Sequence, residues 1–518
     1  MKKHIKAILT AVLVTAMLLS ICISAASEYI TATKAENPPV AMKITWNGES
    51  GQAEVYVRPV GEAKSDTYDG LYDFHNIGGS MYLPMRKICE RLGEIVDWDA
   101  TLGRAYVVRG ENKIDMTGVL VNGTTFIKIR DFEKLGYLVD YYVDEEKKPW
   151  ATLFARPEFD AASEENEFDS YVNYREALSN SYTKLTEEKE LTVAYLGGSI
   201  TYGTNYTKNC WRTMFDEWLR SEYPDASITM INAGYGGTGS SFGAYRVDED
   251  VLAHNPDLVF IEYAVNDNHF TSKYGRYAVT KKSVQEFYET IILKIYEHNP
   301  ETDIVMVYTQ TAAMKRDEQS TVAHEELAEY YNINSVYFGC YLNDYIKENS
   351  LVSTDYIFDG IHPNDKGYAL MMKPLVETFE NTLVAAENGL VSKVLPEKTK
   401  SEHVRLDAYR VPTTDITFSE GWTISEFGCK STTPGATLSF KFTGDEVGVY
   451  TYIGGEAGSV YYRMDGGSWT KKSLTGTAGN DRIPLGIKVE YGEHTFEIKV
   501  SDTLPKTHTV DIKAILIN

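Results

Sequence analysis

Apolar runs that alternate with amphipathic stretches constrain the fold of this chain more than any other feature. Four runs have the length of buried strands, and they span residues 191–196, 228–233, 258–265 and 304–308. Between them lie stretches of helical periodicity, such as 211–219 and 284–296. Continuous apolar strands separated by helices indicate a parallel sheet covered on both faces. The sequence therefore predicts an α/β domain over residues 170–392, built as a three-layer α/β/α sandwich.

The segments on either side of this flavodoxin-like domain have different patterns. Residues 79–93 and 123–136 each repeat the order of strand, short helix and glycine, which predicts a small α+β domain over 35–156. Residues 157–169 are acidic with few apolar side chains, as in an exposed linker. After residue 400 short alternating strands replace the helical periodicity, which predicts a β-sandwich over 400–518.

The flanking domains have their own functional expectations. The repeat resembles the copper amine oxidase N-terminal-like domain, a module appended to many exported bacterial proteins, often as a spacer or wall-associated stalk. No cluster of His and Cys in the repeat indicates a metal. The β-sandwich either binds carbohydrate or is a structural cap, and the sequence does not separate these two roles.

The start of the chain has the three regions of a secretory signal peptide. Lysines at positions 2, 3 and 6 precede an apolar run over 7–23 and three small residues at 24–26. We expect residues 1–26 to be a signal peptide and the protein to be secreted or cell-wall associated in a bacterium. An uncleaved anchor or a lipoprotein attached at Cys22 are the alternatives, although lipid attachment favours a smaller residue than Ile21.

Charge and cysteine content exclude several classes of function. The 518 residues include 51 Lys and Arg against 74 Asp and Glu, for a net charge of −23. Such a surface repels phosphate backbones and anionic lipid, so neither nucleic acid nor a membrane surface is expected as a partner. The cysteines after the signal region are widely spaced and form no C-x-x-C pair, which predicts free buried thiols rather than a disulfide scaffold or zinc site.

Two glycine-rich turns follow the first two strands of the predicted sheet. The first strand leads into Gly197, Gly198 and Ser199, a turn that presents a hydroxyl in the crevice where α/β sheets bind ligands. The second leads into residues 232–239, which contain G-x-G-x-x-G and are followed by Glu262 at a dinucleotide-site spacing. Against a dinucleotide site, this is the second turn of the sheet, and an exported protein has no evident NAD supply. The glycines can instead direct backbone N–H groups at a developing negative charge.

Polar side chains also follow the third strand and lie in a loop near the end of the domain. Asn266 comes after residues 258–265, where it can cap a helix or direct its amide toward the same crevice. Asp359 precedes His362 by three residues in a glycine-containing turn. A carboxylate at this spacing can accept from Nδ1 of the ring, which leaves Nε2 free to deprotonate a hydroxyl.

These four segments together resemble the four blocks of the SGNH (GDSL-like) hydrolases over residues 188–385. The resemblance implies that Ser199 is the nucleophile, that His362 is the general base and then acid, and that Asp359 orients His362. It implies an oxyanion hole made by the backbone N–H of Ser199, the backbone N–H of Gly237 and the side chain of Asn266.

Some positions of these blocks are not fixed by the resemblance. Gly236 is the alternative to Gly237 in the oxyanion hole. Gly198 stands where the family commonly has Asp, and Ala264 stands where it usually has Gly. Both departures resemble the variant found among SGNH proteins that act on acetylated polysaccharides.

The expected protein is thus a secreted serine esterase that removes O-acetyl groups from polysaccharide through an acyl-serine intermediate, with no metal and no organic cofactor. Tyr202 and Tyr235 are the candidates for contact with sugar rings, because they lie nearest in sequence to Ser199 and Gly237. A lipase, a thioesterase or a peptidoglycan O-acetylesterase with the same site are alternatives. A non-catalytic carbohydrate- or cell-wall-binding protein is an alternative from another class.

Overall fold

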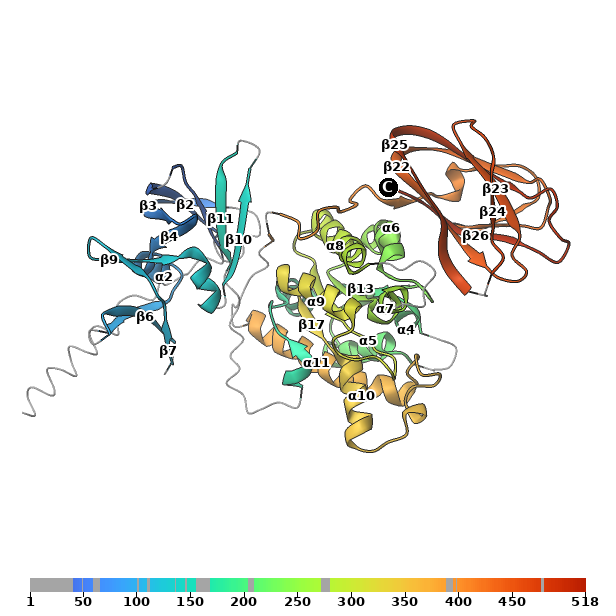
Figure 1. Ribbon diagram of the computed structural model, residues 1–518. Helices are drawn as coiled ribbons and strands as arrows, with labels where there is room; N and C mark the ends of the chain where they lie inside the picture. The colour runs from blue at the N-terminus through green and yellow to red at the C-terminus, as the bar shows by residue number, and fades with distance from the viewer. Residues whose placement is uncertain are drawn as a thin grey trace, which may run out of the picture. The chain divides into compact units, whose positions relative to one another are not determined.

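The structure is a computed structural model that divides into two compact units (Figure 1). The first unit contains Met1–Glu158 and Val391–Lys398, and the second contains Phe159–Leu390 and Thr399–Asn518. The structure describes residues 41–48, 50–58, 66–99, 102–109, 112–135, 137–144, 147–154, 168–203, 209–271, 280–387, 395–396, 398–476 and 479–518. The expected signal peptide and most of the expected linker lie outside these residues. None of the helices within them is long and apolar enough to cross a bilayer.

The first unit is built mainly from antiparallel strands. One sheet has the order β10-β11-β1-β2-β3-β4-β9-β8, and a smaller one has the order β5-β6-β7. The elements are β1 (Ala41–Thr45), β2 (Ser50–Arg58), β3 (Thr67–Ile77), β4 (Ser80–Pro84), α2 (Met85–Arg91), β5 (Ile95–Asp99), β6 (Arg104–Arg109), β7 (Asn112–Asp115), β8 (Val119–Val121), β9 (Thr124–Lys128), the 3-10 helix η1 (Ile129–Leu135), β10 (Leu138–Val143) and β11 (Pro149–Phe154).

The two copies of the sequence repeat lie side by side in this unit. Strand β4 of the first copy pairs antiparallel with β9 of the second, with Leu83 opposite Ile127. Each strand runs directly into a short helix, which is α-helical in the first copy and 3-10 in the second. Gly93 follows the first helix with φ +83°, as expected of a glycine stop, whereas Gly136 lies outside the described residues.

The central domain is a six-stranded sheet between two layers of helices, so the predicted α/β fold is confirmed. Its order is β12-β17-β16-β15-β13-β14, parallel throughout except at β12. The strands are β12 (Val172–Asn173), β13 (Glu190–Gly197), β14 (Ser227–Gly234), β15 (Leu258–Glu262), β16 (Asp303–Val307) and β17 (Asn334–Val336). The two- and three-residue strands β12 and β17 were not predicted, because strands this short leave no periodicity to detect.

Helices cover both faces of this sheet (Figure 1). The helical elements are η2 (Asp169–Tyr171), α3 (Ser179–Thr183), η3 (Lys184–Glu188), α4 (Ser199–Tyr202), α5 (Trp211–Glu222), α6 (Ser240–Asp250), η4 (Leu252–His254), α7 (Ala264–Thr271), α8 (Lys281–His298), α9 (Gln319–Tyr330), α10 (Phe338–Glu348), η5 (Ser353–Asp355) and α11 (Asp365–Glu387). Helices α5, α10 and α11 pack on one face around Trp211 and Phe215, which are fully buried against Phe260 of the sheet. Helices α6 to α9 pack together on the other face.

One predicted strand is shorter in the structure than in the sequence pattern. Residues 258–265 were expected to be extended, but β15 ends at Glu262 and α7 begins at Ala264. Ala264 and Val265 are buried in the first turn of the helix, which prolongs the apolar run past the end of the strand. Asn266 therefore lies in the first turn of α7 rather than in a loop.

The C-terminal region is the predicted β-sandwich. It contains β18 (Tyr409–Arg410), η6 (Thr413–Asp415), β19 (Thr417–Phe418), β20 (Trp422–Ile424), β21 (Cys429–Ser431), β22 (Thr437–Ile453), β23 (Ser459–Met464), β24 (Thr470–Ser473), β25 (Gly479–Val500) and β26 (Val510–Ile517). The long strands β22 and β25 pair antiparallel with several shifts in register, as at bulges where strands bend. Phe440, Phe496 and Ile498 are among the side chains that fill the core between the layers.

Within the second unit, the β-sandwich packs on helix α6 of the central domain. Phe242 of α6 stacks on Tyr450 of β22, with ring centroids 4.4 Å apart and planes 16° apart. Tyr245, Ala514 and Leu516 complete a small buried cluster around this pair. The four described cysteines are free and buried, as predicted, and they are Cys89, Cys210, Cys340 and Cys429.

Candidate active site

The turn that presents Ser199 is tightly packed. Strand β13 ends at Gly197, and after Gly198 the short helix α4 begins with Ser199. A Cβ atom on Gly197 would collide with the Thr201 side chain, and one on Gly198 would collide with Oδ1 of Asn266. The second glycine, which departs from the common Gly-Asp-Ser pattern, therefore allows the close approach of Asn266 to the turn.

The structure brings the three predicted catalytic residues together. The Oγ atom of Ser199 lies 2.8 Å from Nε2 of His362. The Nδ1 atom of His362 lies 2.7 Å from Oδ2 of Asp359. This geometry places the ring between a hydroxyl and a carboxylate, so that Nδ1–H donates to Asp359 and Nε2 can accept the serine proton.

Asp359 is held by its own loop. Its Oδ1 atom accepts hydrogen bonds from the backbone N–H groups of Ile361 at 3.0 Å and His362 at 2.8 Å. Burial acts to raise the pKa of Asp359, but the hydrogen bonds from His362 and Ile361 outweigh burial and lower that pKa below its ordinary value. The carboxylate is therefore ionised at neutral pH, the state in which it orients the ring.

The loop around His362 is fixed at both of its ends. The backbone N–H of Phe358 donates to the carbonyl of His362 at 2.8 Å. Asn364 accepts hydrogen bonds from the backbone N–H groups of Lys366 and Gly367, which closes the first turn of α11. The imidazole is thus presented by a loop whose backbone is hydrogen-bonded before and after it.

The glycine loop after β14 lies against the nucleophile turn. A Cβ atom on Gly236 would be 3.8 Å from the Cβ of Ser199, and Gly237 has φ +73°, a conformation that favours glycine. Thr238 donates its hydroxyl hydrogen bond to the carbonyl of Tyr235 at 2.8 Å and so closes the loop. Both candidates for the oxyanion hole, Gly237 and the alternative Gly236, therefore lie in the loop beside Ser199.

Helix α7, which contains Asn266, is anchored by the next residue, Asp267. The carboxylate of Asp267 is buried, and its Oδ1 accepts from the backbone N–H of Ser240 at 2.9 Å, at the start of α6. Its Oδ2 lies 2.8 Å from Nε2 of the buried His324. These contacts join α7, which contains Asn266, to the end of the glycine loop.

Glu262 is a candidate that the sequence indicated only through its spacing from a possible dinucleotide-binding loop. It is fully buried, and it accepts hydrogen bonds from the backbone N–H of Gly198 at 3.3 Å and the hydroxyl of Thr201 at 2.9 Å. Thr309 donates to its other oxygen at 2.5 Å. Burial raises the pKa of Glu262 to about 7, against the opposing effect of these hydrogen bonds.

The position of Glu262 is unsuited to a dinucleotide site. Both carboxylate oxygens are occupied by protein donors, and the side chain has no solvent exposure. The sequence does contain a signal of this structural role, because Glu262 is the single acidic residue in the otherwise apolar strand β15.

The two tyrosines expected to contact sugar are exposed beside the site. Tyr202 is 54% exposed and Tyr235 is 38% exposed. The ring of Tyr235 meets the ring of Phe242 edge-on, with centroids 5.5 Å apart. Tyr202 lies in α4 with Ser199, and Tyr235 lies in the same loop as Gly237.

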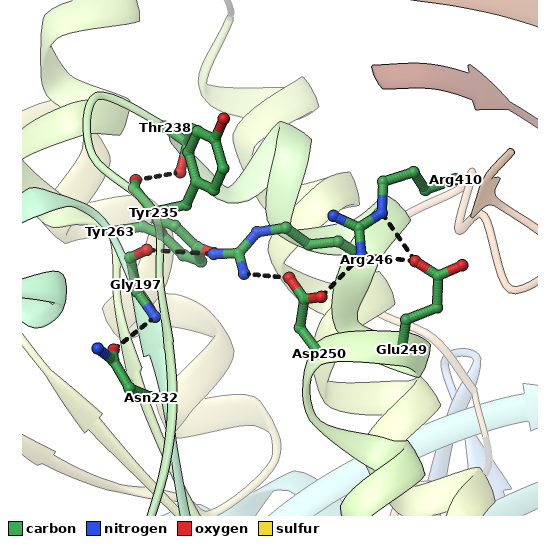
Figure 2. Close-up of polar contacts among 10 residues, drawn as sticks. Gly197, Asn232, Tyr235, Thr238, Arg246, Glu249, Asp250, Tyr263 and Arg410 are labelled. Carbon is green, nitrogen blue, oxygen red and sulfur yellow. Dashed lines mark hydrogen bonds and ion pairs between the residues drawn. The ribbon is translucent and has the colours of Figure 1, made fainter. Parts of the chain in front are cut away.

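A buried arginine behind the nucleophile turn was not singled out by the sequence. Arg246 of α6 donates hydrogen bonds to the carbonyl of Gly197 at 3.2 Å and to the hydroxyl of Tyr263 at 3.0 Å (Figure 2). Its side chain is 1% exposed and forms an ion pair with Asp250. Its partners lie 49 and 17 residues away in the sequence, so no local motif indicates them.

This geometry agrees with the comparison with known families. Residues 195–370 match the GDSL-like Lipase/Acylhydrolase family. The chain contains a GDSL-like hydrolase domain. The matched segment includes Ser199, Gly237, Asn266, Asp359 and His362.

Two solved structures of a two-domain esterase show the same fold over a longer part of the chain. A two-domain esterase active on acetylated mannans is 19% identical and covers 68% of this chain and 98% of its own, with a TM-score of 0.57. The structure of such an esterase co-crystallised with mannopentaose has the same identity and coverage and a TM-score of 0.55. Axe2, an acetylxylan esterase from Geobacillus stearothermophilus, is 18% identical over 36% of this chain and 94% of its own, with a TM-score of 0.32. No curated protein matches the sequence.

Proposed function

We propose that the protein is a serine esterase that removes O-acetyl groups from a polysaccharide. The observation that supports this proposal is the arrangement of Ser199, His362 and Asp359, with 2.8 Å between the serine and the ring and 2.7 Å between the ring and the carboxylate. A hydroxyl, an imidazole and a carboxylate in this order form the constellation that activates a serine for acyl transfer.

The reaction proceeds in two acyl-transfer steps. Nε2 of His362 takes the proton of Ser199 as Oγ attacks the ester carbonyl. The tetrahedral oxyanion is stabilised by the backbone N–H groups of Ser199 and Gly237 and by the side-chain amide of Asn266, each contributing roughly 3 kcal/mol. His362 then gives its proton to the ester oxygen of the sugar, the bond between this oxygen and the acetyl carbon breaks, and an acetyl-Ser199 ester remains while the sugar leaves with a free hydroxyl. Water, deprotonated by His362, attacks this ester, and His362 returns the proton to Oγ of Ser199 as the bond to the acetyl group breaks and acetate leaves.

Asp359 keeps the imidazole in the required tautomer during both steps. Because its ionised carboxylate accepts from Nδ1–H, the lone pair of Nε2 faces Ser199. The same carboxylate stabilises the imidazolium that forms when His362 has taken the proton.

Two features support a polysaccharide as the substrate. One structure of similar fold, which covers 68% of this chain, is a two-domain esterase active on acetylated mannans. In this chain Tyr202 of α4 and Tyr235 of the glycine loop have exposed rings, which can stack on sugar rings. A small acyl group would then lie at Ser199 while the glycan lies over the tyrosines.

The location of the enzyme is part of the same proposal. Residues 1–26 act as a signal peptide, and the N-terminal α+β unit is a copper amine oxidase N-terminal-like module that associates the enzyme with the cell wall. Separation of culture medium, cell wall and cytoplasm, followed by detection of the protein in each, tests this location. Recovery in the cytoplasm alone would contradict it.

The test of the activity is acetate release by the purified protein beside its Ser199→Ala variant. Acetylated mannan, acetylated xylan and O-acetylated peptidoglycan are the substrates, and 4-nitrophenyl esters of increasing chain length define the acyl group. We expect the wild type alone to release acetate, with activity falling steeply beyond short acyl chains. Activity that rises with chain length would favour a lipase or thioesterase. No release from any ester would replace the proposal with a binding role.

A further inference from the structure

The carbonyl of Gly197 is the point at which three parts of the active site meet. It accepts a hydrogen bond from the backbone N–H of Tyr235 at 2.9 Å, which joins the nucleophile turn to the glycine loop. It also accepts from Nη2 of Arg246 at 3.2 Å, which joins both to helix α6 (Figure 2). The position of this oxygen therefore affects how Ser199 is placed relative to the expected oxyanion donors of the glycine loop.

The guanidinium of Arg246 depends on a carboxylate for its burial. Its side chain is 1% exposed, and a buried charge requires a partner that is itself well placed. Asp250, one turn later in α6, provides Oδ2 at 2.7 Å from Nη1 of Arg246. The other oxygen of Asp250 faces away from Arg246 and toward the β-sandwich.

That second oxygen binds an arginine of the C-terminal domain. Nη2 of Arg410, in β18, donates to Oδ1 of Asp250 at 2.7 Å, and its Nε donates to Glu249 at 2.7 Å (Figure 2). The Arg410 side chain is 4% exposed, and its guanidinium lies 3.4 Å from the ring centroid of Phe427. A chain of ion pairs, formed by Arg410, Asp250 and Arg246, thus connects the β-sandwich to the nucleophile turn.

A second contact connects the same helix to the glycine loop. Phe242 of α6 stacks on Tyr450 of the β-sandwich and meets the edge of Tyr235 in the glycine loop. Both connections begin in the C-terminal domain. One ends at Arg246 and the other at Tyr235, and each of these residues donates a hydrogen bond to the carbonyl of Gly197.

We propose that the C-terminal β-sandwich is a structural part of the catalytic unit, with Arg410 and Arg246 as positioning residues for the nucleophile turn. The inference rests on the proposed esterase function. Arg410 fixes Asp250, Asp250 fixes Arg246, and Arg246 fixes the carbonyl two residues before Ser199. Small displacements of a nucleophile strongly reduce the rate of the chemical step. Loss of Arg410 therefore lowers kcat, although Arg410 itself does not contact the substrate.

Arg410→Met in the full chain tests this inference, with 4-nitrophenyl acetate as a substrate that has no glycan for the β-sandwich to bind. We expect kcat to fall about tenfold with KM nearly unchanged and with the pH profile of kcat unaltered. Arg405→Met is the matched control. Arg405 also lies between the domains, where it pairs with Glu446 at 3.2 Å and donates its backbone N–H to Thr290, but none of its described contacts is with the nucleophile turn.

A double-mutant cycle separates positioning from general destabilisation. Arg246→Met should lower kcat at least as much as Arg410→Met, and the double variant should lose no more than Arg246→Met alone. Arg246→Lys, which retains the charge on a single donor nitrogen, should recover part of the loss. It replaces Arg246→Met in the cycle if the latter does not fold. All rates are measured at temperatures well below each variant's unfolding midpoint.

The outcomes distinguish this inference from the proposed function. A wild type that hydrolyses no ester contradicts the esterase proposal itself. An active wild type in which Arg410→Met has no effect, or no more effect than Arg405→Met, overturns the positioning role alone. Losses from Arg246→Met and Arg410→Met that simply add would also overturn it, because independent effects mean that the two arginines do not act through one another.

Discussion

The carboxylate of Glu262 accepts a hydrogen bond at 3.3 Å from the backbone N–H of Gly198, the residue that precedes the nucleophile. Strand β15 thereby supports the turn that ends strand β13, its neighbour in the sheet. With Arg246 on the carbonyl of Gly197, two buried ionisable residues hold the two sides of the single peptide group between Gly197 and Gly198. The role of each residue in and around this turn can be tested by a single substitution.

Glu262→Gln should change how the stability of the protein depends on pH. The pKa of Glu262 is raised from 4.5 to about 7, so between these values the folded state binds more protons than the unfolded state. The unfolding free energy of the wild type should therefore decrease by roughly 3 kcal/mol from this group as pH rises through that window. Urea unfolding at a series of pH values should show a flatter dependence for the variant. Equal slopes for the two proteins would contradict the raised pKa.

Gly198→Ala should lower activity without unfolding the domain. The added Cβ would collide with Oδ1 of Asn266, so the amide must move away from the turn. We expect kcat to fall by about 10²-fold or more, as when an oxyanion donor is lost. Gly455→Ala is the control, because a Cβ there meets no atom within 4 Å. If both variants retain wild-type kcat, Asn266 is not an oxyanion donor.

Asp359→Asn should prevent His362 from acting as a base while preserving its loop. The Asn carbonyl can still accept from the backbone N–H groups of Ile361 and His362, and its NH₂ group then donates to Nδ1. That reversal places the proton on Nε2, facing Ser199, and should lower kcat by about 10²- to 10⁴-fold. The exposed Asp355→Asn, in the preceding turn η5, is the control. A kcat within a few-fold of wild type would mean that another group orients the ring.

Asn266→Ala should lower kcat by about 10²- to 10³-fold with little change in KM. The amide is expected to bind the oxyanion more strongly than the ground-state carbonyl, so its loss affects the transition state. Steady-state kinetics on 4-nitrophenyl acetate give both constants. A rise in KM at constant kcat would instead assign Asn266 to ground-state binding.

The sequence was sufficient to place the reacting groups at one edge of the sheet. Parallel strands end at the same edge, so the order of strands and turns along the chain predicts that Ser199, the glycine loop and Asn266 lie together. The α/β fold and the C-terminal β-sandwich are confirmed for the same reason: their periodicities extend over many residues. The end of β15 was placed too late, because apolar residues continue from the strand into α7 without a change in hydropathy.

The supporting contacts could not be predicted in the same way. Glu262 bonds to a turn 64 residues earlier, and Arg410 bonds to α6 160 residues earlier. Pairings over such separations have no spacing rule, and a single charged residue in an apolar segment does not identify its partner. Only the three-dimensional arrangement of the chain brings these partners together.

The pairing of β4 with β9 makes the two halves of the N-terminal repeat mutually dependent. Each half supplies the hydrogen-bonding edge that the other half lacks, as two subunits do in a dimer, but here both belong to one polypeptide. Removal of either half would expose the strand edge of the other to pairing with foreign chains. Deletion of a single copy should therefore destabilise the copy that remains.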